Sequence, residues 1–228
     1  MSIYQILDRF IFGITRFRKR RMQEFAKVMR PADSARILDV GGTLQNWQLL
    51  AAKPRVTLLN RDLVLDRNDY PENIKFEAGD ALDMPYSDGE YDIVYSNSVI
   101  EHVSTWENQQ RFAEEVLRIG TRIWVQTPAY EFFMEPHYLT PLIHWLPQHW
   151  RRRLVRNFTI WGWLTRPAAA DVERYIREIR LVTFQEMQTL FPDCEIYVER
   201  WLGMPKSYIA VRAAPSEARN IPELSAVS

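Results

Sequence analysis

Seven short apolar segments, separated by stretches with helical periodicity, constrain the fold of this 228-residue chain more than any other feature. Short apolar runs suit strands that are buried on both faces, and helices are the usual connections between parallel strands. The pattern therefore predicts an α/β fold, a mostly parallel seven-stranded sheet with helices on both faces. The predicted strands are residues 37–40, 56–59, 74–78, 91–95, 123–126, 195–201 and 207–211.

Helix-start signals place the helices between these strands. Residues 3–29 carry apolar side chains at helical spacing and end before Pro31, which predicts one or two amphipathic helices. Ser/Thr-x-x-Glu patterns begin at Ser98, Ser104 and Thr183. In such a capping box the hydroxyl and the carboxylate satisfy free backbone amides reciprocally. Helices are therefore expected after the fourth strand and before the sixth.

Residues 130–170 interrupt the alternation with a long stretch rich in aromatic residues and proline, which includes Arg151–Arg153. Such long segments are usually functional. We interpret it as an insertion between the fifth strand and a helix at residues 184–192, serving as a lid, as a basic-aromatic surface for a phosphorylated or lipid-linked partner, or as an extra hydrophobic layer. A single domain is predicted over residues 1–213, with a disordered tail from residue 214.

The charge balance gives no long-range attraction to a polyanion, because Lys+Arg and Asp+Glu both number 29. Nucleic acid is therefore not expected as a partner. The basic cluster Arg16–Arg21 follows the apolar residues 3–15, so peripheral membrane contact stands as an alternative to a solvated helix face.

The N-terminal order of charge and apolar residues does not suit a secretory signal, in which the positive charge comes first. Cys194 is the one cysteine, which excludes an internal disulfide and suits a reducing compartment. A cytoplasmic location is therefore expected.

The strand ends carry the residues of a candidate ligand site. The first strand ends in Asp39-Val40-Gly41-Gly42, and glycine permits both a sharp turn and a close approach of backbone to ligand. The second ends at Asn60, about 20 residues after this turn, where a ribose-binding side chain lies in nucleoside sites. The third strand precedes Gly79-Asp80-Ala81, and the fourth ends at Ser96-Asn97 before Glu101-His102.

In this order and spacing the motifs resemble those of class I S-adenosylmethionine (SAM)-dependent methyltransferases, particularly the group with the pattern LDVGxGxG … GDAxxLPFxDxxFDxVxxxxVxEHV. The resemblance covers residues 36–129, with a weaker match at residues 201–211. It implies a Rossmann-like sheet of order 3-2-1-4-5-7-6 with the last strand antiparallel. It also implies SAM as the cofactor and methyl transfer as the activity.

The resemblance also implies roles for individual residues. Asp39, Gly41 and Gly42 would contact the methionine and ribose portions of SAM. Asp80 would bind the adenine amino group, and Ala81 would donate its backbone amide. Ser96 and Asn97 would approach the methionine end.

Two departures from the family pattern concern the ribose end of the site. Gly42 is followed by Thr43 instead of leading to a third glycine. Asn60 stands where the family has the carboxylate that binds both ribose hydroxyls, and an amide lacks the charge-assisted bond of a carboxylate. Asp62 is a candidate to replace it.

Two histidines are candidates for general base. Methyl transfer is an in-line displacement for which the cofactor supplies the electrophile, so the protein aligns the nucleophile and removes its proton. His102 follows the fourth strand and His137 follows the fifth, both at the edge where ligands bind in such sheets. Glu135 and Tyr138 are candidates for substrate contact. The alternatives are that His102 packs behind a capped helix and that His137 belongs to a turn.

A metal site is a minor alternative. Small-RNA 3′-terminal 2′-O-methyltransferases carry a Glu-x-x-Glu-His motif with downstream histidines, and Glu101, His102 and His137 match it in part, with Ser98 replacing the first glutamate. The main prediction is a metal-free methyltransferase that acts on an oxygen of a small-molecule, sugar or lipid-linked acceptor. The alternatives are RNA 2′-O-methylation with a metal, and a SAM-fold binding or scaffold protein without activity.

Overall fold

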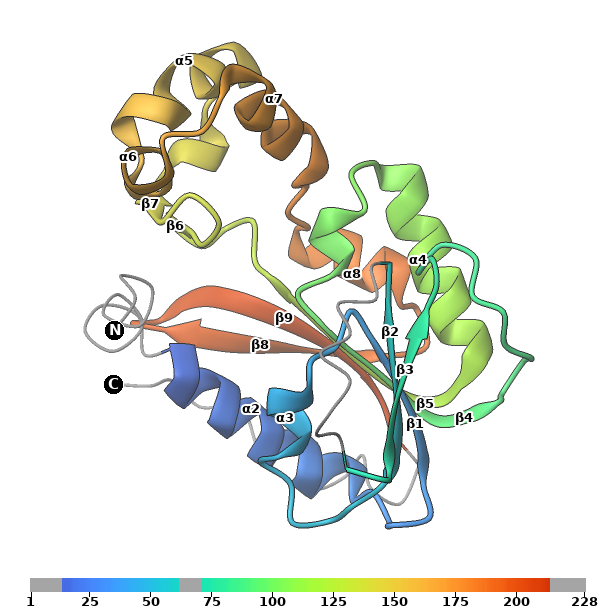
Figure 1. Cartoon of the computed structure of the whole chain (residues 1–228). Helices are drawn as coiled ribbons and strands as arrows, with labels where there is room; N and C mark the ends of the chain where they lie inside the picture. Colours follow the sequence, from blue (N-terminus) through green and yellow to red (C-terminus); the bar gives the residue numbers. More distant parts are fainter. Residues whose placement is uncertain (1–13, 62–70, 214–228) are drawn as a thin grey trace. The chain divides into compact units, whose positions relative to one another are not determined.

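The computed structural model describes residues 14–61 and 71–213 and has the predicted α/β fold class (Figure 1). Its main sheet has seven strands in the order β3-β2-β1-β4-β5-β9-β8. The short strands β6 and β7 form a separate two-stranded sheet, and without them in the count the order is the predicted 3-2-1-4-5-7-6. The main-sheet strands are β1 (Arg36–Val40), β2 (Arg55–Asn60), β3 (Ile74–Ala78), β4 (Tyr91–Asn97), β5 (Gly120–Pro128), β8 (Glu195–Trp201) and β9 (Met204–Arg212).

Each predicted strand is present, and several are longer than predicted. β5 begins at Gly120, three residues before the predicted start, and β4 continues to Asn97, beyond the predicted end at Tyr95. The apolar run marks only the buried centre of a strand, whereas backbone pairing continues into less apolar residues at its ends. β8 and β9 pair antiparallel, in agreement with the implied closing hairpin.

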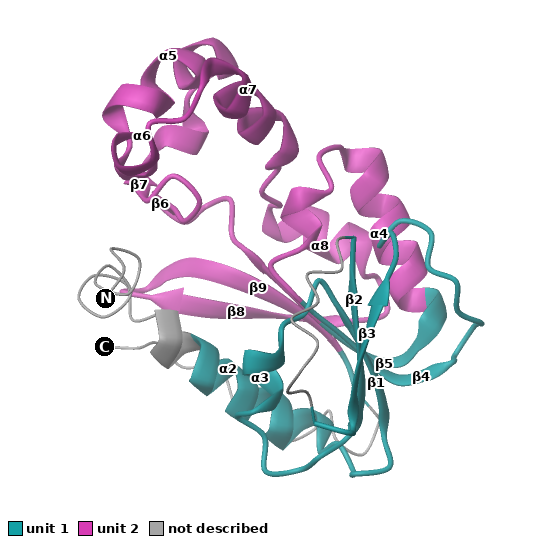
Figure 2. Ribbon diagram, viewed as in Figure 1, with its two compact units in different colours: residues 1–96, 118–124, 212–221 teal, residues 97–117, 125–211, 222–228 magenta. Residues whose placement is uncertain are grey.

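The chain forms two compact units, shown in separate colours in Figure 2. Unit 1 comprises residues 1–96, 118–124 and 212–221, and unit 2 comprises residues 97–117, 125–211 and 222–228. The single domain expected over residues 1–213 stays a prediction.

An aromatic cluster holds helix α2 (Ile14–Met29) against the sheet of unit 1. The Phe25 ring lies edge-on to Trp47, Tyr95 and Trp124, with ring centroids 5.9, 5.1 and 5.6 Å apart. Such pairs contribute about 0.5–1.5 kcal/mol each beyond the burial of their area. The helix predicted over residues 3–29 is therefore confirmed from Ile14, and its earlier part lies outside the described residues.

Two of the three predicted capping boxes are wrong. Ser98 has φ 58°, not the extended backbone of an N-cap, and its hydroxyl donates to Gln126 Oε1 at 3.2 Å. The helix after it is a single 3-10 turn, η2 (Ile100–His102), without a side-chain cap. Ser104 likewise has φ 73°, and Thr105 accepts the Asn108 amide at the start of α4 (Trp106–Ile119). The box at Thr183 is confirmed at the start of α8 (Phe184–Leu190).

The predicted insertion is present between β5 and α8 and has a core of its own. It contains β6 (Met134–Glu135), β7 (Thr140–Pro141), η3 (Ile143–Trp145), α5 (Gln148–Phe158) and α6 (Ile160–Thr165), followed by α7 (Ala169–Glu178). Trp161 stacks on Tyr175 with 4.7 Å between ring centroids, against a buried cluster. Trp150 and Trp163 are exposed instead, so the aromatic residues divide between core and surface. The buried cluster is Tyr138, Ile143, Val155, Val172 and Ile176.

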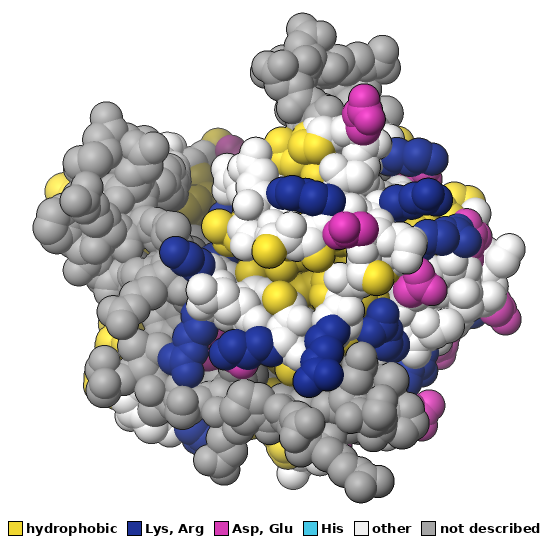
Figure 3. All heavy atoms as spheres, turned by 90° about the horizontal axis from the view of Figure 1, so that it is seen from below, with side chains coloured by type: hydrophobic (Ala, Val, Ile, Leu, Met, Phe, Trp, Pro, Cys, Tyr) yellow, Lys and Arg dark blue, Asp and Glu magenta, His cyan; other side chains and the backbone are white. Residues whose placement is uncertain are grey.

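Basic side chains are unevenly distributed. Figure 3 shows a face on which Lys and Arg side chains, in dark blue, gather around a hydrophobic area. The equal totals of acidic and basic residues therefore do not mean an even surface charge on this face. None of the helices in the described ranges is long and apolar enough to cross a membrane. The predicted tail and residues 1–13 of the N-terminal segment lie outside those ranges.

The capping box of α8 gives a test of local stability. Glu186 Oε2 accepts the Thr183 amide at 2.8 Å, and Oε1 pairs with Arg180 at 2.5 Å. Desolvation acts to raise the pKa of Glu186, but the bonds from Arg180 and Thr183 outweigh it and lower that pKa.

We expect Glu186→Gln to lower the free energy of unfolding by about 1 kcal/mol at pH 7. The pKa of Glu186 is lower in the folded chain than in the unfolded chain. The stabilisation by its carboxylate is therefore fully present when the pH is above the ordinary pKa of glutamate, and it is lost as the pH falls through the pKa of the folded state. Urea unfolding at pH 7 and at acidic pH measures both effects. Glu178→Gln, at an exposed position, is the control, and an equal cost at every pH would contradict the prediction.

Candidate functional site

The glycine turn after β1 needs both of its glycines. Gly41 has φ 72°, in the left-handed region, and its amide donates to Leu59 O at 2.8 Å. A Cβ on Gly42 would lie 1.9 Å from Asp39 Oδ2. Thr43 is the N-cap residue of the short helix α3 (Leu44–Trp47), so the chain enters a helix where the family has its third glycine.

Asp39 lies beneath this turn as a buried carboxylate. Its Oδ2 accepts the Trp47 indole N–H at 2.7 Å, while Oδ1 has no hydrogen-bond partner within the described part of the chain. Burial raises the pKa of Asp39 well above its ordinary value, and the Trp47 bond opposes this rise. A buried carboxylate oxygen without a donor is costly, and a cationic ligand group would offset that cost. This geometry suits the methionine ammonium of SAM.

Asn60, at the end of β2, holds the turn from the other side. Its Nδ2 donates to Gly42 O at 3.1 Å. The amide therefore supports the backbone of the turn, and its carbonyl oxygen is the atom it can offer to a ribose hydroxyl. Asp62, the other candidate for this role, lies outside the described residues.

The remaining candidate cofactor-binding residues differ in their solvent exposure. Asp80 is half-exposed, accepts the Leu82 amide at 3.0 Å and pairs with Arg61 at 3.4 Å, and Ala81 beside it is partly buried. Ser96 is buried, and its hydroxyl donates to Val40 O at 3.1 Å, which ties β4 to β1. Asn97 is partly buried and belongs to unit 2.

In unit 2 the structure brings His102 and His137 together, although they are 35 residues apart in sequence. Their Nε2 atoms lie 3.2 Å apart, and the rings are perpendicular. His137 Nδ1 lies 2.7 Å from Glu135 Oε1, and Glu135 Oε2 accepts the Tyr138 amide at 2.6 Å. Because Glu135 is buried and held at both oxygens, it fixes the orientation of the His137 ring.

Neighbouring charges give the two imidazoles different pKa values. Burial and the adjacent His137 lower the pKa of His102 to about 4. Burial also acts to lower the pKa of His137, but the hydrogen bond and charge of Glu135 outweigh it and raise that pKa. With both rings neutral, one chain of hydrogen bonds satisfies the group: His102 Nε2–H donates to His137 Nε2, and His137 Nδ1–H donates to Glu135. In this arrangement His102 Nδ1 carries a lone pair that can accept a proton.

Glu101 lies beside this pair as a second buried carboxylate. Its Oε2 accepts the Thr127 hydroxyl at 3.0 Å, and its Oε1 has no partner among the residues described. Burial raises the pKa of Glu101, and the charge of His137 opposes the rise. One potential ligand atom each from Glu101, His102 and His137 lies within 4.8 Å of the others.

Sequence reasoning missed Trp47 and the supporting role of Glu135. Trp47 lies eight residues after Asp39, at the end of α3, and its indole N–H donates to the buried carboxylate. A tryptophan soon after the glycine turn was the available signal. Glu135 was expected to contact substrate, and its two oxygens are instead bonded to His137 and Tyr138.

Comparison with known proteins agrees with the resemblance predicted above. Residues 38–122 match the family model described as "Methyltransferase domain". This match and the shared fold confirm the resemblance to the class I SAM-dependent methyltransferases, and SAM is the cofactor that this family uses.

Curated relatives match over a short segment. Ajmaline N-methyltransferase from Rauvolfia serpentina is 44% identical over 47 residues, or 21% of this chain and 15% of that enzyme. Norajmaline N-methyltransferase from the same plant is 40% identical over 49 residues, or 22% of this chain and 16% of that enzyme. The match thus spans about a sixth of the length of these relatives.

Solved structures match over most of the chain at low identity. A structure of the Haloferax volcanii Trm112 methyltransferase activator with a methyltransferase has a TM-score of 0.51 and 13% identity, covering 94% of this chain and 99% of that one. A structure named as an O-methyltransferase from Nostoc punctiforme has a TM-score of 0.51 and 11% identity, covering 86% of this chain and 55% of that one. At these identities the likeness shows the fold alone.

The close approach of Gly42 to Asp39 predicts that a single added methyl group weakens cofactor binding. We expect Gly42→Ala to weaken SAM binding, measured by calorimetry, by about tenfold or more, because the new Cβ displaces the Asp39 carboxylate. The control is Gly203→Ala, where a Cβ meets nothing within 4 Å. It should cost about 1–2 kcal/mol of stability through its positive φ and leave SAM affinity unchanged. Equal SAM affinities in the two variants would contradict this account of the turn.

Proposed function

We propose that this chain, whose residues 38–122 match a methyltransferase domain, transfers the methyl group of SAM to an oxygen atom of a small-molecule, sugar or lipid-linked acceptor. The observation that carries this proposal is the hydrogen-bonded series Glu135–His137–His102 in unit 2. A hydroxyl oxygen becomes a much stronger nucleophile as it loses its proton, whereas an amine that is already neutral can attack before it loses one. A built proton acceptor therefore favours oxygen over nitrogen.

On the cofactor side, the turn at Asp39, Gly41 and Gly42 would hold the methionine portion of SAM, and the free Asp39 oxygen would accept its ammonium. The Asn60 carbonyl would accept a ribose hydroxyl. Asp80 and the Ala81 amide would bind the adenine, and Asn97 would approach the methionine end. When bound, SAM supplies an electrophilic methyl group on a sulfonium.

On the acceptor side, the histidines would remove a proton. As the acceptor oxygen forms its bond to the methyl carbon and the carbon–sulfur bond breaks, His102 Nδ1 takes the hydroxyl proton. His102 then passes its Nε2 proton to His137, whose imidazolium is stabilised by the Glu135 carboxylate. His137 has the raised pKa and is thus the stronger base of the two.

Replacing either histidine should separate catalysis from cofactor binding. We expect His102→Ala and His137→Ala each to lower turnover about 10²- to 10⁴-fold, on an acceptor found by screening with labelled SAM, while calorimetry shows unchanged SAM affinity. The control is His149→Ala, a histidine of α5. If both variants keep full turnover, the base assignment is wrong. If the unaltered chain binds no SAM at high micromolar concentration, it is a scaffold and not an enzyme.

A second candidate is metal-assisted methylation of a hydroxyl, favoured by the grouping of Glu101, His102 and His137. Two zinc-bound imidazole nitrogens in tetrahedral geometry lie about 3.3 Å apart, close to the 3.2 Å between the two Nε2 atoms. The unpartnered Glu101 Oε1 suits the third ligand, and Glu135 would orient His137 as outer-shell carboxylates do. A divalent ion held there would polarise the acceptor oxygen. The three residues Glu101, His102 and His137 support a metal site, but they do not identify RNA as the methyl acceptor.

Metal analysis distinguishes the two candidates. The metal-assisted enzyme should retain about one divalent ion per chain after purification, and Glu101→Ala or His137→Ala should lose it. The control is His149→Ala, which should keep the ion. Activity that is unchanged by a chelator, in protein without bound metal, would leave the histidine base as the mechanism. The cytoplasmic location and the role of the insertion stay predictions.

A further inference from the structure

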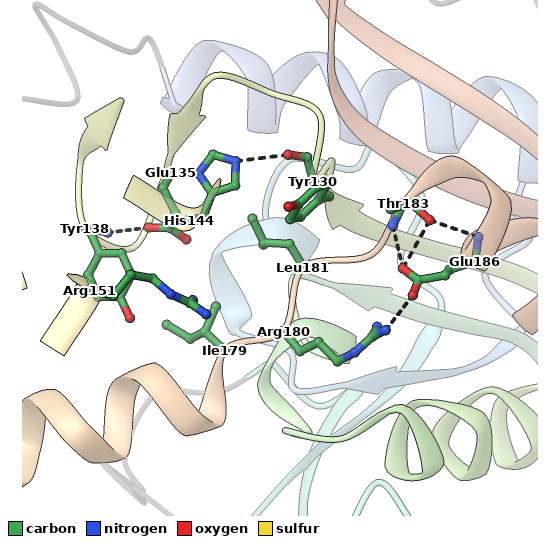
Figure 4. Close-up of a pocket in the computed structure, with 10 residues that line it drawn as sticks. All are labelled: Tyr130, Glu135, Tyr138, His144, Arg151, Ile179, Arg180, Leu181, Thr183 and Glu186. Carbon is green, nitrogen blue, oxygen red and sulfur yellow. Dashed lines mark hydrogen bonds and ion pairs between the residues drawn. The ribbon is translucent and has the colours of Figure 1, made fainter. Parts of the chain in front are cut away.

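A cavity of about 280 Å³ opens in unit 2 between the insertion and the segment before α8 (Figure 4). Its walls combine apolar surface from Ile179 and Leu181 with the polar side chains of Tyr130, Tyr138, His144 and Arg151. This volume lies just below the usual range of about 300–1,000 Å³ for small-molecule pockets. The cavity therefore suits one small compound, or the end group of a larger one.

Three buried polar atoms of the cavity residues lack a hydrogen-bond partner in residues 14–61 and 71–213: Tyr138 Oη, His144 Nδ1 and Arg151 Nε. The Tyr138 and His144 side chains belong to residues only 1% and 8% exposed. Buried polar groups are nearly always paired, and leaving one unpaired costs stability. Three of them around one cavity indicate that a ligand provides the partners.

The chemistry of each atom defines what that ligand must offer. His144 Nε2 lies 3.0 Å from the Tyr130 carbonyl and must donate to it, so His144 Nδ1 is an acceptor when the ring is neutral. Burial, together with the charge of Arg151, lowers the pKa of His144 and keeps the ring neutral. The buried Tyr138 hydroxyl has no partner among the described residues and can donate its hydrogen to a ligand. The cavity thus offers two donors and one acceptor.

The charges around the cavity leave Arg151 uncompensated. The Glu135 carboxylate is held by His137 and the Tyr138 amide, and Glu186 is paired with Arg180. Arg151, in contrast, has no ion pair with any residue of the described ranges, and Figure 4 shows its side chain among the residues that line the cavity. A guanidinium in this setting recognises an oxyanion.

We propose that this cavity binds the anionic end of the methyl acceptor, with a carboxylate or phosphate on Arg151 and Tyr138 and a ligand O–H or N–H donating to His144. The identification of this ligand as the methyl acceptor rests on the proposed function. The existence of an anion site in the cavity does not depend on that function. Glu135 connects the two features within unit 2, because it lines the cavity and also holds His137.

Calorimetry with chosen probes tests the anion site. The probes are 4-hydroxybenzoate for a carboxylate and glycerol 3-phosphate for a phosphate, with 4-hydroxybenzamide and glycerol as their uncharged counterparts. One charged probe should bind the full chain at least about tenfold more tightly than its counterpart, and which one binds identifies the anion. Arg151→Met should lower that affinity about tenfold or more, whereas Arg153→Met, at an exposed position of the same helix, should not. Equal binding of charged and uncharged probes would overturn the proposal.

Thermal unfolding separates a ligand-binding role from a structural one. Arg151→Met and Tyr138→Phe each remove a buried group without a partner, so each should raise the Tm of the ligand-free chain by about 2 °C. Lower Tm values with unchanged probe affinity would show that both residues are structural and would overturn the proposal. SAM affinity, measured on the same variants, should be unchanged. A chain that binds a charged probe but no SAM would refute the proposed enzyme and retain the anion site.

Discussion

The buried carboxylate of Asp39 is the interaction on which the glycine turn of unit 1 depends. It lies at the end of β1, accepts the indole of Trp47 and occupies the space that a side chain at Gly42 would need. Trp47 in turn packs on Phe25, so the glycine turn is connected to the aromatic cluster beneath α2. A carboxylate in this position is tolerable because one oxygen has a donor and the other is available to a cationic ligand.

In unit 2 the buried carboxylate of Glu135 has a comparable role. One oxygen sets the orientation of His137, and the other holds the Tyr138 backbone at the cavity. In the proposed function, the insertion would therefore contribute to proton transfer and to ligand recognition through the same residue. The core of the insertion includes Tyr138 and Val155, so the packing of this core holds Glu135 and the cavity residues in place.

The extent of the family match explains why the acceptor has to be inferred from structure. The match ends at residue 122, whereas Glu135, His137 and Arg151 all follow it. The glycine turn, Asn60 and Asp80 lie within the matched segment, where the order and spacing of the motifs resemble those of a SAM site. Of the acceptor-side groups, His102 lies within the matched segment, whereas the others belong to the insertion, and only their contacts indicate what they can bind.

The sequence by itself determined the strands and the glycine turn, because burial periodicity and backbone freedom are local properties, and the order of the strands followed from the resemblance to the methyltransferase family. It also brought Asp39, Asn60 and Asp80 to one edge of the sheet, because parallel strands end together. It did not determine contacts. Ser98 matches a capping box, yet its positive φ and the nearby Gln126 give it another partner. The approach of His102 to His137, and the cavity around Arg151, were decided by the tertiary structure, because contacts between distant residues depend on the path of the intervening chain.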